Sequence, residues 1–284
     1  MKLVRFFTTL LFLSFSLNVI AKQEHKLNIV TSSSPIASIF YMVLGDVGKL
    51  EYLAKNHGCA HDYNMQPSQL KLIKNADIIA YIDDNFDGFI IQSIQQNSAY
   101  IMKFSTLPLH LLKNENGSVN WHLWLKTANV RLMLQEILNV LVKVAPEHSE
   151  EFVDNYHKAL KNLDLLDMRV KNLGETKNIL LLADSLEYLF DNFKISPQKI
   201  FLGHKQPTLK YVNDIRGIFT KTEKTCLVID NHQSDEYYTN ILNNPKVNII
   251  SLNAENWTIP KDVDKKQIYY GQFQLMLNSI RPCF

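Results

Sequence analysis

The chain of 284 residues lacks the short motifs that mark catalysis on nucleotides, esters or peptides. It has no G-x-S-x-G elbow, no H-E-x-x-H, no C-x-x-C, no P-loop and no G-x-G-x-x-G fingerprint. Glycine and proline are scarce, at nine residues each, whereas 46% of the residues are hydrophobic. These features argue against an enzyme of those classes and against a linker-rich or disordered chain.

The chain also lacks an excess of either charge. Lys and Arg number 30 against 28 Asp and Glu, and two of the basic residues, Lys2 and Arg5, stand at the extreme N-terminus. Proteins that bind nucleic acids neutralise phosphates with clustered basic side chains. We therefore expect no nucleic-acid partner.

Long apolar runs are confined to the N-terminal segment. Lys2 and Arg5 precede an apolar stretch, Phe6 to Ile20, that no acidic residue interrupts, and Ala21 supplies a small residue at its end. This pattern predicts a signal peptide over residues 1–21 and an exported protein. An uncleaved anchor is the alternative, although the run is short for a membrane span.

Cysteine is rare, with three residues at positions 59, 226 and 283. In an exported chain, Cys226 and Cys283 can form a disulfide that ties down the C-terminal tail. Cys59 is then left over. It is either a buried thiol or a soft metal ligand two residues from His61.

Strand-like and helix-like segments alternate along the rest of the chain. The apolar run 76–82 has the length of a strand and predicts a strand buried on both faces of a parallel sheet. A long amphipathic helix is predicted from 147 to about 173, and the alternation then resumes. The predicted fold is α/β, with two α/β lobes that each carry a mostly parallel sheet and are joined by one long helix. The expected boundaries are 1–21 for the signal peptide, 22–145 for the first lobe, 146–174 for the linking helix and 175–284 for the second lobe.

Several His and Asp residues fall near predicted strand ends, where parallel α/β sheets bind their ligands. They are His61, His122, Asp184, His204, Asp230 and His232. A shared metal site in a cleft between two lobes is one interpretation. Separate histidines that are hydrogen-bonded in loops are the other, and the spacing alone does not decide between them.

The segment from Cys59 to Asp77 reads CAHDYNMQPSQLKLIKNAD. It resembles the His-Asp-Tyr, Pro-Ser and Asn-Ala-Asp signature of the metal-binding receptors of bacterial ABC transporters, of the zinc-uptake type. The residues WHLWL around His122 are similar to the second histidine segment of that family, and LGH, ending at His204, is similar to another of its segments.

Cys226 and Cys283 are similar to the cysteine pair of the zinc receptors in this family. Together the matches extend over nearly all of the chain after residue 21. The resemblance implies two α/β lobes bridged by a long helix, with a metal ion in the cleft. It also implies a periplasmic, monomeric receptor that captures Zn²⁺, or Mn²⁺ in some relatives, delivers it to a membrane permease and catalyses no reaction.

The resemblance carries the ligand role to His61 and His122. The family's third histidine corresponds to Ala183, and its late aspartate corresponds to Asn253. The substitutes expected to complete the metal shell are Asp230, Asp184, His232 and Cys59.

A receptor with these replacements has a second interpretation. The chain would then be a degenerate receptor that keeps the fold and binds a protein partner, with weak or no metal binding. A hydrolytic metalloenzyme is a third interpretation, which lacks a convincing general base in this sequence.

Overall fold

A computed structural model of the protein describes residues 26–55, 63, 65–95, 97–114, 116–174, 178–201, 208–219, 225–231, 233–242, 244 and 246–284. The predicted signal peptide lies outside these ranges, as do four of the residues singled out above, Cys59, His61, His204 and His232. Within the described ranges, no helix combines the length and hydrophobicity that a bilayer crossing requires.

The first lobe contains a four-stranded parallel sheet. Its strands are β1 (Asn28–Ser33), β2 (Lys49–Ala54), β3 (Ile78–Tyr81) and β4 (Tyr100–Lys103), in the order β2-β1-β3-β4. The connecting helices are α1 (Ser34–Leu44), α2 (Pro67–Lys74) and α3 (Gly88–Ile94). Parallel strands need such crossover helices, so the alternation in the sequence accounts for the parallel arrangement of the strands.

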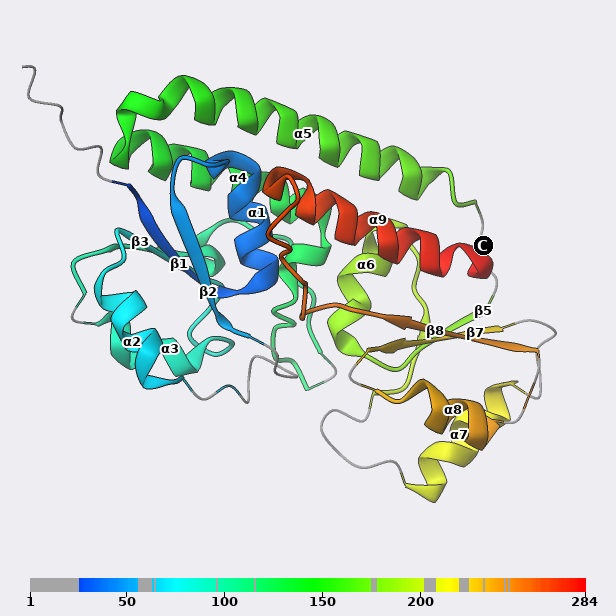
Figure 1. Ribbon diagram of the computed structural model, residues 1–284. Helices are drawn as coiled ribbons and strands as arrows, with labels where there is room; N and C mark the ends of the chain where they lie inside the picture. Colours follow the sequence, from blue (N-terminus) through cyan, green and yellow to red (C-terminus); the bar gives the residue numbers. More distant parts are fainter. Residues whose placement is uncertain are drawn as a thin grey trace, which may run out of the picture.

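The second lobe repeats this plan with another parallel sheet. Its strands are β5 (Asn178–Leu181), β6 (Gln198–Lys199), β7 (Thr225–Asp230) and β8 (Val247–Leu252), in the order β6-β5-β7-β8. Its helices are α6 (Glu187–Asn192), α7 (Leu209–Phe219) and α8 (Asp235–Leu242). Figure 1 shows the two sheets in separate lobes that lie side by side, which confirms the predicted fold class.

The central strands of both sheets are buried on their two faces. In β7, Cys226 and Val228 belong to a core that extends through both lobes, whereas Leu227 and Ile229 pack with residues of α7 and α8. β3 alternates in the same way. Ile78 and Ala80 belong to the shared core, whereas Ile79 and Tyr81 pack with residues of α2 and α3. Because successive side chains of a strand point to opposite faces, double burial produces continuous apolar runs instead of polar alternation.

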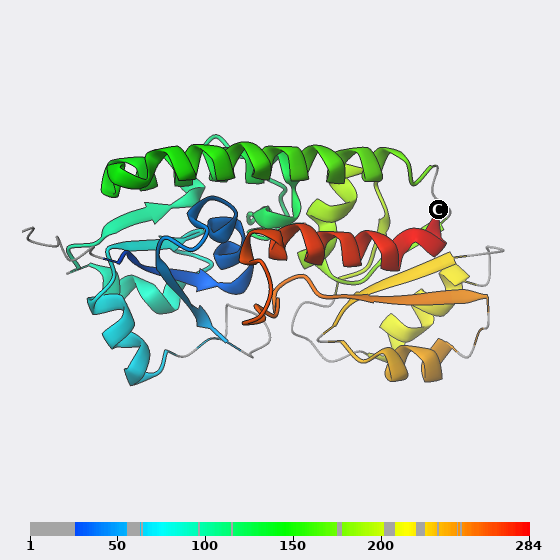
Figure 2. The same ribbon diagram turned by 45° about the horizontal axis from the view of Figure 1, so that its top comes forward.

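Two long antiparallel helices, α4 (Thr127–Val144) and α5 (Ser149–Lys171), form an outer layer. In both views α5 lies across the two lobes (Figures 1 and 2). The sequence predicted a helix from residue 147, but Pro146 begins a 3-10 turn and α5 starts at Ser149. The last helix, α9 (Ile268–Ile280), packs against α5, α1 and β8, so it joins the end of the chain to both halves.

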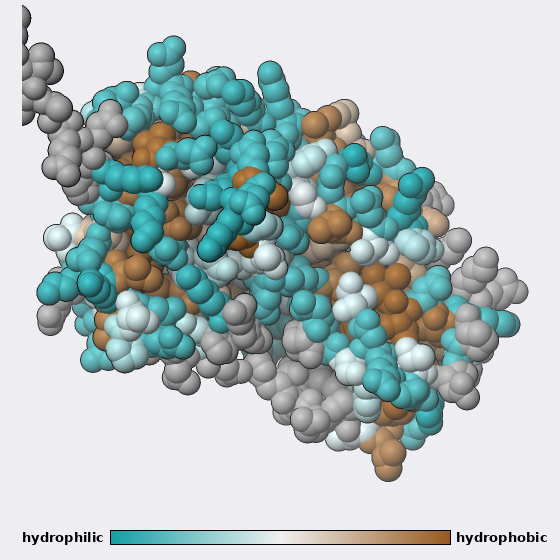
Figure 3. Space-filling view, in the orientation of Figure 1, coloured by the Kyte–Doolittle hydropathy of each residue, from teal (hydrophilic) through white to brown (hydrophobic). Residues whose placement is uncertain are grey.

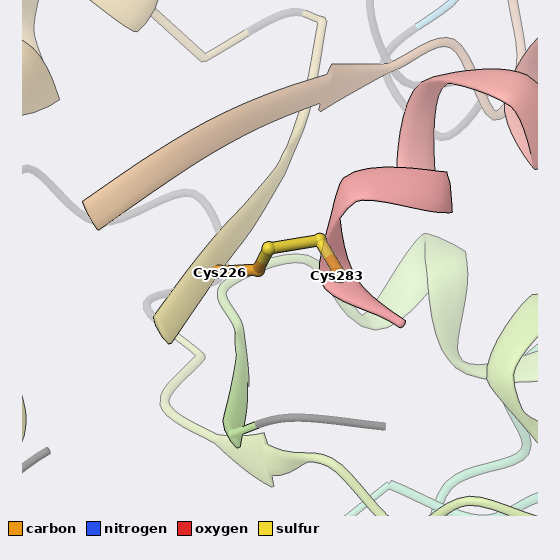
Figure 4. Close-up of a disulfide and its surroundings, with 2 residues drawn as sticks. All are labelled: Cys226 and Cys283. Atoms are coloured by element: carbon orange, nitrogen blue, oxygen red, sulfur yellow. A yellow bond between two sulfur atoms is a disulfide. The ribbon is translucent and has the colours of Figure 1, made fainter. Parts of the chain in front are cut away.

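A disulfide fixes the C-terminal tail to the second sheet. Cys226 lies on β7 and Cys283 in the 3-10 turn after α9, with their Cα atoms 5.7 Å apart (Figure 4). Both cysteines are buried. The bridge closes a loop that contains β8 and α9.

In the view of Figure 3 the surface is largely hydrophilic, with apolar patches over the first lobe and a further apolar area over the second lobe. Part of that apolar area belongs to β8, the edge strand, where Val247, Ile249 and Ile250 are half-buried. By contrast, α1 is buried along its whole length, as expected of a helix that is apolar on all sides. Its first residue, Ser34, follows directly on the carboxyl end of β1.

Candidate metal centre

His122 lies in the segment between the first lobe's sheet and α4, immediately before a 3-10 turn formed by Leu123–Leu125. It is only 6% exposed. Its Nδ1 lies 2.8 Å from Oδ1 of Asn120, and its backbone N–H donates to the same oxygen at 3.1 Å. A side-chain oxygen that accepts at Nδ1 requires a proton there, so Nε2 is the nitrogen that could bind a metal.

The Nε2 atom of His122 faces a carboxylate from the far end of the chain. Oε1 of Glu255 lies 2.7 Å from it, and the two side chains are 7% and 13% exposed, respectively. Glu255 follows β8, and its backbone carbonyl accepts a hydrogen bond from Oγ of Ser34, which follows β1. The carboxyl ends of the two sheets therefore meet at this pair, as ligand sites of parallel sheets do.

Asn120 connects His122 to the second lobe. Its Nδ2 donates to the backbone carbonyl of Asp184 at 2.8 Å and to Oε2 of Glu187 at 3.0 Å. Glu187 is itself buried and forms an ion pair with Lys199. The hydroxyl of Tyr188 donates to the backbone carbonyl of Asn120. Because both ends of the Asn120 amide are used, the orientation of the His122 ring is fixed from both lobes.

Aromatic rings line the other sides of the imidazole. Phe86 and Trp124 make edge contacts with it, at centroid distances of 5.6 and 5.3 Å. Phe86 is held in the turn after β3 by Asp87, whose Oδ2 accepts from the backbone N–H of Ile82 at 2.7 Å. Asp87 is fully buried, and its burial raises its pKa to about 7. The apolar wall excludes water from one side of the histidine.

The second lobe brings two predicted carboxylates close to this pair. Asp230, at the end of β7, is 2% exposed and accepts a hydrogen bond of 2.5 Å from Oγ of Ser185. Asp184 lies at the start of the turn before α6, next to the buried methyl group of Ala183. Neither carboxylate has a direct contact with His122 among the interactions that the structure describes, but both act on its charge.

The pKa of His122 is raised above its usual 6.5. Burial acts in the opposite direction, since it disfavours the imidazolium. The hydrogen bond and the charge of Glu255, with further contributions from Asp184 and Asp230, outweigh burial. The negative charge of these carboxylates thus favours a positive charge at Nε2, which could be a proton or a metal ion.

The neighbours of the His61 segment are well anchored, although His61 itself is outside the described ranges. The hydroxyl of Tyr63 donates to Oε1 of Gln69 at 2.7 Å, and Nε2 of Gln69 donates to the carbonyl of Leu53 at the end of β2. Oδ2 of Asp77 accepts from the backbone N–H of Asn28 at 2.8 Å. Tyr63 and Gln69 therefore tie the start of α2 to the carboxyl end of β2, whereas Asp77 joins the amino ends of β1 and β3, so these residues of the signature have structural roles.

Of the residues predicted from the sequence, the structure brings His122, Asp184 and Asp230 to one region. His61 and His232 stay predictions, because they lie outside the described ranges, as do Cys59 and His204. Among the described residues there is no group of three or more His, Cys, Asp or Glu side chains arranged to hold a metal ion. A metal site at the His122–Glu255 pair would therefore need at least one further ligand in addition to these two side chains.

Two participants were missed by sequence reasoning, Glu255 and Asn120. Asn253 drew attention as the replacement for an aspartate, and the acidic residue two positions later was not considered. A search for every carboxylate within three residues of a strand end would have found Glu255. Asn120 gave no such signal, because its role depends on contacts with residues more than 60 positions away.

Two parallel α/β lobes, with a shielded histidine and carboxylate where their strand ends meet, define a binding protein of the two-lobed receptor class. The chain belongs to the family described as zinc-uptake complex component A, periplasmic, whose profile matches residues 29–281. The family consists of solute-binding receptors.

Individual relatives agree with this assignment. The chain is 34% identical over 289 residues to the uncharacterized protein RP014 of Rickettsia prowazekii, which covers 100% of this chain and 92% of the relative. It is 24% identical over 212 residues to the manganese ABC transporter substrate-binding lipoprotein scaA of Streptococcus gordonii, covering 67% of this chain and 68% of that one.

Among solved structures, the periplasmic zinc binding protein TroA from Treponema pallidum superimposes with a TM-score of 0.77. It shares 16% sequence identity with this chain, and the match covers 91% of this chain and 99% of TroA. At that identity the likeness concerns the fold, and it agrees with the two-lobed architecture described above.

Proposed function

We propose that the protein is a periplasmic receptor that captures a Zn²⁺ ion between its lobes and delivers it to an ABC permease. The observation that carries this proposal is the buried His122, whose Nε2 faces the Glu255 carboxylate at 2.7 Å between the ends of the two sheets. Membership of a zinc-uptake receptor family supports it. Mn²⁺ is the alternative cargo, because the scaA relative is named for manganese.

The ligand chemistry favours a borderline-soft divalent ion. Imidazole nitrogen suits zinc, and a carboxylate adds the negative charge that a divalent cation requires. We propose His61 as the second imidazole, since the anchored Tyr63 lies only two residues away. Asp230, Asp184 and His232 are the proposed further ligands from the second lobe.

We further propose that the receptor acts without chemical catalysis and as a single chain. A cargo site of this kind must release its ion to the permease, so ligands from two lobes are an advantage: separation of the lobes lowers the number of ligands on the metal. The ion pair between Glu187 and Lys199 lies in the second lobe, and Asn120 couples it to His122. Movement between the lobes would therefore disturb the histidine directly.

The test is isothermal titration of the chain without residues 1–21, stripped of metal with a chelator. We expect one Zn²⁺ per chain, bound more tightly than about micromolar, or about 8 kcal/mol. Binding no tighter than roughly millimolar, which is about 4 kcal/mol, refutes a capture function. A folded protein that fails this titration would instead fit the degenerate receptor that binds a protein partner.

A pair of histidine variants assigns the binding to this site. His122→Ala is expected to remove most of the zinc affinity. His157→Ala is the matched control, because His157 is exposed on α5. Equal losses in both variants would show that zinc binds to surface histidines. Parallel titrations with Mn²⁺ measure the selectivity of the site, and zinc is expected to bind more tightly than manganese to imidazole and carboxylate ligands.

A further inference from the structure

Asn253, which corresponds to the family's late aspartate, is engaged in a local turn. Its Nδ2 donates to the carbonyl of Asn256 at 2.7 Å, and its Oδ1 accepts from the N–H of Asn256 at 2.9 Å. Its own carbonyl accepts from Nε1 of Trp257 at 2.9 Å. The amide thus uses both of its ends to close the turn 253–257, and no described contact joins it to His122.

Glu255 is at the middle of this turn and reaches the histidine that Asn253 does not. Its carboxylate lies 2.7 Å from Nε2 of His122, and its side chain is only 13% exposed. This nitrogen is the one that the Asn120 contact leaves to bind a metal. Glu255 therefore presents a longer acidic side chain two residues after Asn253, the position that corresponds to the family's aspartate.

The turn that carries Glu255 is attached to the first lobe, although it follows β8 of the second. Oγ of Ser34 donates to the carbonyl of Glu255 at 3.1 Å and accepts from the N–H of Trp257 at 3.0 Å. Nε1 of Trp124, two residues after His122, donates to the carbonyl of Ala254 at 2.8 Å. These hydrogen bonds to Ser34 and Trp124 consequently fix the position of Glu255 relative to His122.

We propose, on the basis of the metal-capture function above, that Glu255 is a ligand of the captured ion and takes the role of the missing aspartate. The ion inserts between Nε2 of His122 and the Glu255 carboxylate, and displaces the direct bond between them. Because the turn is anchored to Ser34 and Trp124, this carboxylate belongs functionally to the first lobe. The first lobe then supplies a histidine and a carboxylate before any residue of the second lobe contributes.

A competing interpretation gives the opposite sign. If Glu255 only occupies His122 and does not bind the ion, its removal frees Nε2 and tightens metal binding. If Glu255 is a ligand, its removal weakens metal binding. Loss of a residue that merely hydrogen-bonds to a metal ligand already lowers affinity at least about tenfold, so loss of a ligand itself should cost no less. The direction of the change therefore separates the two roles.

The experiment compares zinc affinity in the wild type, Glu255→Gln and Glu236→Gln, where Glu236 is exposed on α8 and serves as the control. We expect at least a tenfold loss for Glu255→Gln and no change for Glu236→Gln. Unchanged or tighter binding by Glu255→Gln overturns the proposal while leaving the receptor function intact. Absence of zinc binding by the wild type overturns both.

A double variant tests the place of the carboxylate. Asn253→Asp in the Glu255→Gln background restores the family's aspartate, but we expect no recovery of affinity, because the side chain at 253 is turned into its own loop. Recovery to within a few-fold of the wild type would contradict the assignment. Near-ultraviolet circular dichroism and thermal unfolding of each metal-free variant confirm that the fold is retained.

Discussion

The perturbation Asn120→Ala probes the network that fixes His122. The change removes the oxygen that accepts from Nδ1 and from the backbone N–H of His122, and the two hydrogen bonds that Nδ2 donates to Asp184 and Glu187. Asn120 is 2% exposed, so water does not readily replace these partners. Each lost bond costs about 1 kcal/mol, more for the charged Glu187, so the free energy of unfolding should fall by about 4 kcal/mol.

The same change should also weaken metal binding, because the His122 ring loses the contact that sets its tautomer. Loss of such a partner typically costs about 10- to 100-fold in metal affinity. Urea unfolding of the metal-free protein measures the first effect, and zinc titration in buffer measures the second. Asn139→Ala, on the exposed face of α4, is the control and should change stability by less than about 0.5 kcal/mol.

Asn120→Asp separates the two effects. It keeps an acceptor for Nδ1 of His122 but replaces the Nδ2 donor with an oxygen that faces the carboxylate of Glu187. Stability should therefore fall while zinc affinity is largely retained. If Asn120→Ala binds zinc within twofold of the wild type, the claim that Asn120 positions the metal-binding histidine is wrong.

Three further predictions follow from titration and covalent structure. The pKa of His122 is raised above 6.5, so its imidazolium stabilises the metal-free fold below pH 6.5 and this contribution is lost as pH rises through the folded pKa. Zinc affinity should instead increase with pH, and titrations in buffers of different ionisation enthalpy should detect proton release on binding. Burial raises the pKa of Asp87 from 3.8 to about 7, so its contribution to stability is full below pH 3.8 and lost as pH rises through 7. Between pH 5 and 8 this amounts to about 3 kcal/mol in urea unfolding, and Asp87→Asn should remove that difference. Replacement of Cys226 and Cys283 by Ser removes a disulfide with a sequence separation of 57, and should lower the free energy of unfolding by about 4 kcal/mol under non-reducing conditions. A variant as stable as the wild type in the absence of reducing agent would contradict this prediction.

The strands were the most predictable part of the fold. The apolar run 76–82 contains β3 (Ile78–Tyr81), because a strand buried on both faces of a parallel sheet is apolar along its length. Helix boundaries were less accurate. The helix expected from residue 147 begins at Ser149, because Pro146–His148 form a 3-10 turn before it.

The order of strands within each sheet could not be obtained from the pattern, because it depends on which elements pack together after they form. The site was likewise predictable only in part. His122 was found from its segment, and the charges of Asp184 and Asp230 do act on it. Glu255 was not, because the turn that points it at His122 is held by Ser34 and Trp124, which are distant in the sequence.

The most direct test of the account is a crystal structure of the zinc-loaded protein, with anomalous scattering to locate the ion. The account predicts zinc between the lobes, at about 2.0–2.1 Å from Nε2 of His122 and about 2.0–2.2 Å from a carboxylate oxygen of Glu255. Zinc bound elsewhere, with Glu255 still hydrogen-bonded to His122, would contradict it.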